Sequence, residues 1–299
     1  MLPLQYYISH PNVLFESLLR KYGGWIPDKQ YIQMLYYLKM GNRLNLDNPQ
    51  TFSEKIQWLK LYNRRPEYTM MVDKFAVKAY VADIIGSEYI IPTLGVWDRP
   101  EDIDFDSLPN EFVLKTTHGG GSGGVFICTD KSKLDARLVV EKMKKAMKGD
   151  VYRCYREWPY KNVKRRIIAE QYIGIKNDDL KDFKFFCFNG EPKYCQVIGG
   201  RKTNMVIDFF DTDWNHQPFH EPKHYPFSAQ IVNRPHSFQL MLELSRKLSA
   251  DIPFLRVDFY EIGNHPLFGE LTFFPTSGLG GFEPDKWDKV FGENIILAK

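Results

Sequence analysis

The sequence predicts an α+β fold with antiparallel sheets, and three observations support this class. Apolar residues recur with helical spacing through the first third of the 299-residue chain, whereas a period of two begins at residue 111. The strand-like segments then follow one another through tight turns, without a βαβ series. We expect four parts: a helical region 1–70, a helix–strand region 71–110, a first lobe 111–172 and a C-terminal lobe 173–299.

Capping residues mark the expected helices of the first third. Thr51 and Glu54 have the spacing of a capping box ahead of an apolar run. A second helix is expected over 73–86, with an aspartate at its start and a glycine at its end. Lys74 and Lys78 lie four residues apart in it, so we expect them on one face.

Two hairpins are expected in the C-terminal lobe. The first turns at Asn189–Gly190, a dipeptide typical of two-residue turns, and the second turns near Gly263–Asn264. In the second hairpin the register makes Asp258 and Glu270 antiparallel neighbours on one face. Arg256 lies on the same face as Asp258, because side chains two residues apart on a strand point the same way.

Composition argues against several classes of protein. A net charge of +3 is too small to indicate nucleic-acid binding. The chain contains no apolar stretch of the ~18 residues that a membrane span needs, and it does not start like a secretory signal. None of the four cysteines forms a CxxC pair. We therefore expect a cytoplasmic protein with a large core, without nucleic acid as a partner.

A glycine-rich loop, THGGGSGG, joins two of the expected strands at 117–124. Gly119, Gly121 and Gly124 satisfy GxGxxG, but the loop leads into a strand, whereas a Rossmann site needs a helix there. No GK[ST] follows, so the loop is not a Walker A loop either. A glycine loop between antiparallel strands is typical of a flap whose backbone N–H groups cover phosphates. A plain flexible hairpin tip is the alternative.

Charged side chains on strands point to a phosphate and a metal. Lys115 alternates with apolar residues in FVLKT, and a lysine there needs an anionic partner, unless the strand is a surface edge. The neighbouring carboxylates of Asp258 and Glu270 repel each other unless a divalent cation or a proton lies between them, and Mg²⁺ prefers such oxygen ligands. Arg256 suits a γ-phosphate or an anionic intermediate. An exposed, salt-bridged hairpin is the alternative.

The order of these parts resembles the ATP-grasp superfamily. Four stretches look more narrowly like the TupA-like ATP-grasp family of bacterial cell-envelope polysaccharide gene clusters: GNRLNLDNPQTFSEKIQWLKLYNRRP, VDKFAVKAYV, LPNEFVLKTTHGGGSGG and RVDFYEIGNHPLFGELTFFPTSG. The resemblance covers roughly residues 40–290. It implies an ATP-grasp fold, in which two α+β lobes with antiparallel sheets hold ATP between them, plus a helical N-terminal segment.

The resemblance also implies roles for individual residues. It implies that Lys74 and Lys115 bind the α- and β-phosphates of ATP, and that the loop covers the phosphates with Gly119, Gly120, Gly121, Ser122, Gly123 and Gly124. It also implies an adenine-binding segment of Glu170, Gln171, Tyr172 and Ile173, and a ribose ligand at Asp178 or Asp179. For catalysis it implies Lys184 on the γ-phosphate, Asp258 and Glu270 on Mg²⁺, and Arg256 on an acylphosphate. Thr272 stands where the superfamily commonly has asparagine, which puts a second metal in doubt.

The implied reaction is ATP-dependent ligation of a carboxylate to an amine through an acylphosphate, which makes an amide. The expected partners are a carboxylate-bearing saccharide, such as one with a uronic acid, and an amine or amino acid, for capsule or exopolysaccharide synthesis. Association with polysaccharide-assembly enzymes is a further expectation. A basic segment containing Arg153, Arg156, Lys164 and Arg165 is a candidate site for the anionic acceptor.

Two alternative functions explain fewer of these features. A glycosyltransferase would use Asp211 and Asp213 as a DxD motif, although two such acids are common in turns. A carbohydrate-binding module would stack sugars on Trp97, Trp158 and Trp214, although aromatic residues more often serve the core. Neither alternative accounts for the glycine loop, the strand lysine and the paired acids together.

Overall fold

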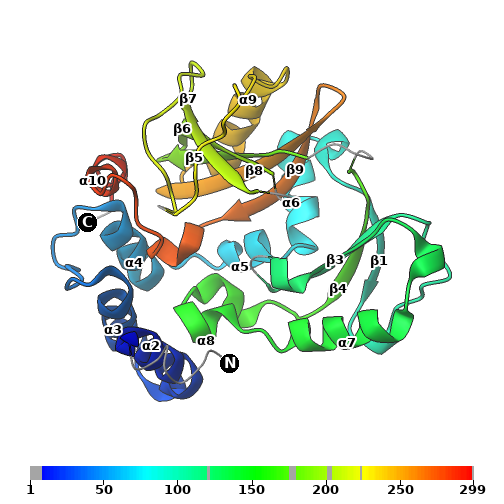
Figure 1. Cartoon of the computed structure of the whole chain (residues 1–299), viewed down its shortest axis with the longest axis horizontal. Helices are drawn as coiled ribbons and strands as arrows, with labels where there is room; N and C mark the ends of the chain where they lie inside the picture. Colours follow the sequence, from blue (N-terminus) through cyan, green and yellow to red (C-terminus); the bar gives the residue numbers. More distant parts are fainter. Residues whose placement is uncertain (1–8, 120–121, 175–179, 201–203, 223, 298–299) are drawn as a thin grey trace.

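A computed structural model describes residues 9–119, 122–174, 180–200, 204–222 and 224–297. It has two antiparallel sheets (Figure 1). The four-stranded sheet, in the order β1-β4-β2-β3, comprises β1 Thr93–Trp97, β2 Phe112–Thr116, β3 Val125–Cys128 and β4 Ile167–Gln171. The five-stranded sheet, in the order β7-β6-β5-β8-β9, comprises β5 Asp182–Phe188, β6 Glu191–Gly199, β7 Val206–Asp211, β8 Phe254–Ile262 and β9 His265–Thr272. The expected α+β class with antiparallel sheets is confirmed.

Both C-terminal hairpins turn where the sequence predicts. Asn189 and Gly190 have φ values of 51° and 88°, and Gly263 and Asn264 have φ values of 54° and 68°. Positive φ at both central residues is the geometry of a type I′ turn, whose twist matches that of the flanking strands. These turns set the first pairs of β5 with β6 and of β8 with β9. The register then shifts by one residue between Phe186 and Cys187 and between Asp258 and Phe259.

Helices surround the two sheets. Their bounds are α2 Pro11–Tyr22, α3 Asp28–Met40, α4 Phe52–Tyr62, α5 Glu67–Val72, α6 Ala76–Ile85, α7 Ala136–Met147, α8 Val151–Tyr155, α9 Phe238–Ser249 and α10 Lys286–Glu293. Short 3₁₀ turns complete the chain: η1 Gly23–Trp25, η2 Ser87–Tyr89, η3 Pro100–Asp102, η4 Ser122–Gly124, η5 Lys131–Lys133, η6 Trp158–Asn162 and η7 Pro275–Gly278. The capping box of Thr51 and Glu54 at the start of α4 is present as expected.

Helix α6 begins three residues later than the sequence predicts. The Asp73 carboxylate accepts hydrogen bonds from the N–H groups of Phe75 and Ala76, and the Lys74 N–H donates to the Thr117 carbonyl. Lys74 therefore lies in the turn before the helix, and a backbone hydrogen bond ties this turn to the start of the glycine-rich loop.

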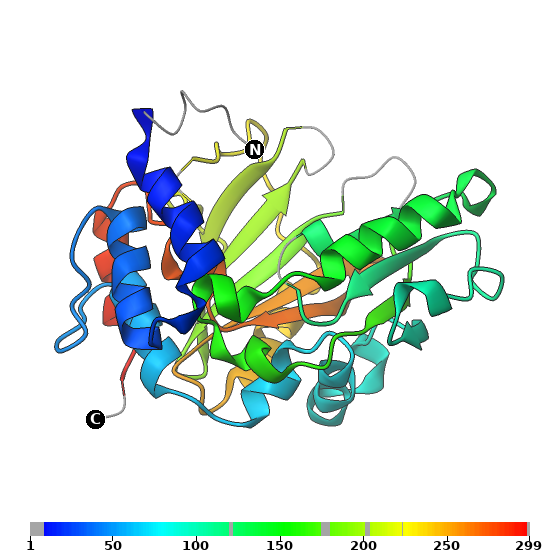
Figure 2. The same ribbon diagram turned by 90° about the horizontal axis from the view of Figure 1, so that it is seen from below.

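Each sheet has its own hydrophobic core. The larger core contains aromatic side chains of β5–β8, packed with α4, α5, α6, α9 and α10. The smaller core packs Val139 and Met143 of α7 against Phe112 and Leu114 of β2, and Figure 2 shows α7 lying along the four-stranded sheet. The N-terminal helices α2 and α3 lie at the opposite end of the molecule from that sheet (Figures 1 and 2). In the described part of the chain, every helix is too short or too polar to cross a membrane.

Candidate active site

Three lysines converge near the end of the four-stranded sheet. Glu170 on β4 is buried, and its two carboxylate oxygens lie 2.5 Å from the Nζ atoms of Lys78 and Lys115. With Lys74, these residues line a narrow cavity of about 10 Å³ that Ile90, Ile91, Phe268 and Gly269 complete. Three cations facing one carboxylate leave a surplus of positive charge, which suits a polyphosphate.

Burial and neighbouring charges oppose each other in this cluster. Burial by itself raises the pKa of Glu170, but the charges of Lys115 and Lys78 outweigh burial and lower that pKa below its usual value. Burial also lowers the pKa of Lys78. Lys78 was not among the predicted site residues, and its only sequence signal was its spacing of four from Lys74.

Lys74 connects this cluster with the paired carboxylates. Its Nζ donates to the Gly119 carbonyl over 2.7 Å and lies 3.5 Å from the Glu270 carboxylate. The chain between α5 and α6 thus places one cation between the glycine-rich loop of one sheet and β9 of the other. An anion bound here would contact residues from both lobes.

The glycine-rich loop is a connection between two antiparallel strands, as expected. β2 pairs with β3, and Lys115 is opposite Val125. A Cβ atom added to Gly119 or Gly124 would lie 2.8 or 2.3 Å from Thr116 Oγ1, whereas Gly123 has open space around it. Two glycines are therefore needed for close packing against β2. Gly120 and Gly121 lie outside the described residues.

The expected adenine segment continues from the lysine cluster. Glu170 and Gln171 end β4, and Tyr172 and Ile173 follow directly. The Gln171 N–H already donates to the Pro92 carbonyl over 3.0 Å. Gln171 would therefore contact a base through its own carbonyl oxygen. The candidate ribose ligands Asp178 and Asp179 lie outside the described residues.

Asp258 and Glu270 are paired in the β8–β9 ladder, as expected. A register shift between Asp258 and Phe259 produces this pairing, because the turn by itself would place Asp258 opposite Gly269. Arg256 donates to both oxygens of Asp258 over 2.7 and 2.8 Å, to Glu270 over 3.2 Å and to the Thr272 hydroxyl over 3.1 Å. Lys184 on β5 forms an ion pair with Asp258. These cations neutralise two acids that would otherwise repel each other.

The electrostatics of Glu270 depend on four neighbouring cations. Burial by itself raises its pKa, but Lys74, Lys184, Arg256 and Lys115 together lower the pKa of Glu270 to about 2. The acid is therefore ionised at neutral pH. Cations from both sheets contribute to this shift, which supports one continuous site.

The oxygen atoms on β8 and β9 fit a magnesium ion. Two carboxylates and a hydroxyl are hard ligands, and Mg²⁺ commonly takes one or two carboxylates together with substrate phosphates. Among the described residues, no group of three or more His, Cys, Asp or Glu side chains could hold a metal. Substrate oxygens would therefore have to complete the coordination of an ion held by Asp258 and Glu270.

Within the basic segment, the prediction of acceptor binding was wrong for Arg156. That side chain is 2% exposed and donates to the Gly23 and Arg153 carbonyls over 2.9 and 2.7 Å, so it anchors the N-terminal helices. Lys164 and Arg165 are paired with Asp98 and Asp150 respectively, and Arg153 donates to the Lys21 carbonyl.

The features behind the two alternative functions have structural roles. Asp211 accepts hydrogen bonds from the N–H groups of Asp213 and Asn215, so its carboxylate stabilises the turn after β7. Trp214 stacks on Phe210 at a centroid distance of 4.1 Å. Trp97 and Trp158 also pack against the two cores.

The sequence did not reveal a constrained turn directly after β9. Thr276, Ser277 and Gly278 have φ values of 45°, 59° and 63°, and such a conformation costs on the order of 1–3 kcal/mol at a non-glycine residue. Two buried acids hold the turn: Glu221 accepts from the Thr276 hydroxyl over 2.8 Å, and Glu157 accepts from the Ser277 hydroxyl. Burial raises the pKa of both acids. No local sequence signal indicated this turn, because the two acids that hold it are distant from it along the chain.

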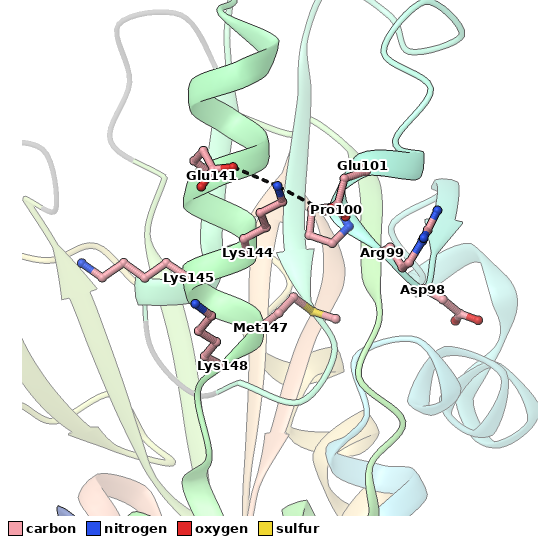
Figure 3. A pocket seen from close by; sticks show the side chains of 9 residues that line it. All are labelled: Asp98, Arg99, Pro100, Glu101, Glu141, Lys144, Lys145, Met147 and Lys148. Atoms are coloured by element: carbon pink, nitrogen blue, oxygen red, sulfur yellow. Dashed lines mark hydrogen bonds and ion pairs between the residues drawn. The ribbon is translucent and has the colours of Figure 1, made fainter.

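A larger hollow of about 310 Å³ lies elsewhere, between α7 and η3 (Figure 3). Lys144 there pairs with Glu101 and Glu141 over 3.1 and 2.9 Å, and Lys145 extends away from these ion pairs. None of the predicted site residues lines it. The candidate site is therefore the smaller region between the sheets, where predicted site residues come together.

Known structures with a similar fold are ligases with low sequence identity. They include D-alanine–D-alanine ligase from Helicobacter pylori (14% identity, 83% of this chain and 70% of that chain, TM-score 0.44). L-amino acid ligase from Bacillus licheniformis also matches (14% identity, 76% of this chain and 50% of that chain, TM-score 0.42). D-alanine–D-alanine ligase from Coxiella burnetii covers 81% of this chain and 64% of its own, at 13% identity and a TM-score of 0.43.

Comparison with sequence families identifies the family of this chain. No curated protein sequence matches this chain. A family model described as TupA-like ATPgrasp matches residues 54–296, which include the lysine cluster, the glycine-rich loop and the paired carboxylates. The chain therefore belongs to the TupA-like ATP-grasp family.

Proposed function

We propose that this protein is an ADP-forming ligase that joins a carboxylate to an amine through an acylphosphate. The observation that carries the proposal is the position of Lys74, which contacts both the glycine-rich loop and Glu270. One bound molecule with several negative charges would bridge the lysine cluster and the acids on β8 and β9. ATP has this arrangement of charges, and the family supports it.

The lysines and the glycine-rich loop would bind the triphosphate. Lys74, Lys78 and Lys115 supply positive charge for the α- and β-phosphates, with Glu170 holding the last two in place. The backbone of residues 119–124, including the Ser122 position, would close over the phosphates. Gln171, Tyr172 and Ile173 would line the adenine, and Asp179 is the proposed ribose ligand.

Asp258 and Glu270 would hold Mg²⁺, with the Thr272 hydroxyl as a further ligand. The ion supplies charge neutralisation at the β- and γ-phosphates when it is bound. Arg256 and Lys184 already interact with Asp258, so anionic oxygens entering the site would compete with Asp258 for these two cations. We assign Lys184 to the γ-phosphate and Arg256 to the developing acylphosphate.

The chemistry then needs positioning and charge neutralisation, without a protein nucleophile. A substrate carboxylate oxygen attacks the γ-phosphorus, the bond to the β-phosphate oxygen breaks, and ADP leaves. The amine attacks the acyl carbon of the acylphosphate, inorganic phosphate leaves, and the amine loses a proton. The product is an amide.

For the substrates, we propose a saccharide that carries a carboxylate, of the uronic-acid type, and an amine or amino acid. We further propose a role in capsule or exopolysaccharide synthesis, where association with polysaccharide-assembly enzymes would bring the acceptor to the site. The constrained turn 275–278 follows β9 directly, so we place the acceptor carboxylate near it.

Thermal unfolding tests the nucleotide half of the proposal. At a hundred times its dissociation constant a ligand adds about 2.7 kcal/mol, which raises the midpoint by several degrees. We expect Mg²⁺ with ATP to stabilise the wild type and not Lys115→Met, whereas Lys144→Met on α7, outside the site, keeps the response. Stabilisation by sugar nucleotides alone would reject the ligase and support a transferase.

Trapping tests the ligase half. With ATP, Mg²⁺ and a uronic acid, hydroxylamine should replace the natural amine and give a hydroxamate together with ADP. Lys144→Met should give the same yield, and Lys184→Met should give none. ATP binding without hydroxamate formation from a panel of saccharide carboxylates would reject the proposed acceptor class while leaving the nucleotide site intact.

A further inference from the structure

Helix α2 carries its largest apolar side chains on the face turned to solvent. Leu14, Phe15, Leu18 and Tyr22 are 38%, 57%, 43% and 60% exposed. Their spacing of three and four residues places them on one side of the helix. Trp25 in η1, just beyond the end of the helix, is 84% exposed. Most surface helices instead turn their apolar side chains toward the protein core.

The opposite face of α2 is turned inward although it carries charge. Glu16 is buried there, and it forms ion pairs with Arg20 and with Lys39 of α3. Leu19 is the only other buried residue of the helix. The packing of α2 on the protein thus uses a buried acid, and leaves the apolar stripe without a partner within the described chain.

The segment that carries the stripe has a positive net charge. Residues 9–43 contain five basic and two acidic residues, so this segment has the same net charge, +3, as the whole chain. Both acids point inward: Glu16 is buried, and Asp28 pairs with Arg64 and Arg156. The basic residues Lys21, Lys29 and Arg43 are exposed.

We propose that α2 and η1 bind the anionic surface of a lipid membrane, with the stripe Leu14, Phe15, Leu18, Tyr22 and Trp25 inserted among the headgroups. An amphipathic helix with aromatic and leucine residues on one face and basic residues beside them lies in the membrane interface. Trp and Tyr favour that depth, and each nearby Lys or Arg adds attraction to anionic lipid. α2 and α3 lie at one end of the molecule (Figure 2).

A second copy of this chain fits the surface less well. A twofold dimer would bring the same surface of two molecules together, and the basic residues beside the stripe would repel each other. An anionic lipid surface matches both the apolar stripe and its basic surroundings. The inference does not depend on the proposed ligase activity, because no residue of the candidate site takes part.

Vesicle flotation of the full-length protein tests the proposal. We expect binding to vesicles of phosphatidylcholine with about 30% phosphatidylglycerol to be at least tenfold stronger than to phosphatidylcholine alone, and to weaken in high salt. The variant Phe15→Ser/Leu18→Ser/Trp25→Ser should lose at least tenfold in binding to the anionic vesicles. Lys21→Gln/Lys29→Gln/Arg43→Gln should lose the preference for anionic lipid.

The matched control replaces three apolar side chains elsewhere, which are 69%, 92% and 71% exposed, as Leu138→Ser/Ile231→Ser/Ile296→Ser. It should bind vesicles like the wild type. No binding of the wild type to anionic vesicles, or an equal loss in the control, would overturn the proposal. So would sedimentation showing a wild-type dimer that the Phe15, Leu18 and Trp25 variant dissociates, because the stripe would then be a contact between copies.

Discussion

Replacing Glu170 with glutamine should destabilise the protein by about 3 kcal/mol, because two partly buried lysines then lose their shared counter-charge. The side chains of Glu170, Lys78 and Lys115 are 6%, 13% and 18% exposed. At 2.5 Å and an effective dielectric constant of about 20, each ion pair has a Coulomb attraction of about 7 kcal/mol. Most of this attraction offsets the dehydration of the three charges.

The net cost of breaking a buried ion pair is typically about 3–5 kcal/mol, and the partial exposure of both lysines places Glu170→Gln at the lower end. A loss of about 3 kcal/mol corresponds to a lower melting temperature by about 6–12 °C. Differential scanning calorimetry measures it. The control is Glu191→Gln, because Glu191 pairs with Arg246 where both side chains are well exposed, and such a pair contributes about 1 kcal/mol or less.

The nucleotide should reverse the effect. If Lys78 and Lys115 bind phosphates, Mg²⁺ with ATP supplies the negative charge that the variant lacks, so it should stabilise Glu170→Gln more than it stabilises the wild type. A melting temperature for Glu170→Gln equal to that of Glu191→Gln would refute the electrostatic reasoning. A large destabilisation without recovery by ATP would separate the ion-pair cluster from phosphate binding.

Three further predictions follow from the close contacts of the site. Gly124→Ala should weaken ATP binding at least tenfold by calorimetric titration, because its Cβ would meet Thr116 Oγ1 at 2.3 Å, while Gly123→Ala, with open space, should leave binding unchanged. Lys60 is buried and donates to the Ser277 carbonyl over 2.7 Å; burial lowers the pKa of Lys60, and the charge of the buried Glu157 opposes this shift. Lys60→Met and Glu157→Gln should each cost about 3 kcal/mol in urea unfolding, and the double variant less than their sum, because each single change removes the opposite charge that offsets the burial of the other group. Asp258→Asn should lower the rate of ATP turnover about 100-fold or more and raise the Mg²⁺ concentration needed; unchanged turnover would remove Asp258 from the metal site.

Local sequence signals predicted the elements that local interactions build. The Thr51–Glu54 capping box and the turns at Asn189–Gly190 and Gly263–Asn264 depend on residues within a few positions of one another. In the β8–β9 hairpin the two-residue turn by itself would place Asp258 opposite Gly269. A register shift between Asp258 and Phe259 moves the pairing by one residue and places Asp258 opposite Glu270. The resemblance of the sequence to the ATP-grasp family predicted the α+β ATP-grasp fold, and the match to the family model confirms the family.

Long-range contacts decided what the local signals could not. The sequence indicated that Lys115 needed an anionic partner, but the partner in the structure is Glu170 on a neighbouring strand, shared with Lys78 from α6. Arg156 was expected to meet a substrate and instead anchors the N-terminal helices. Charge alone does not tell a buried structural arginine from an exposed binding residue.

By itself, the sequence determined where α4 begins, where the two C-terminal hairpins turn, and which family the chain resembles. The tertiary structure alone decided that Lys74 links the glycine-rich loop to Glu270, that Glu157 and Glu221 hold the turn after β9, and that the apolar stripe of α2 faces solvent. The physical reason is the range of the interactions. Capping and turn geometry act between near neighbours, whereas ion pairing and burial depend on which distant segments the fold brings together.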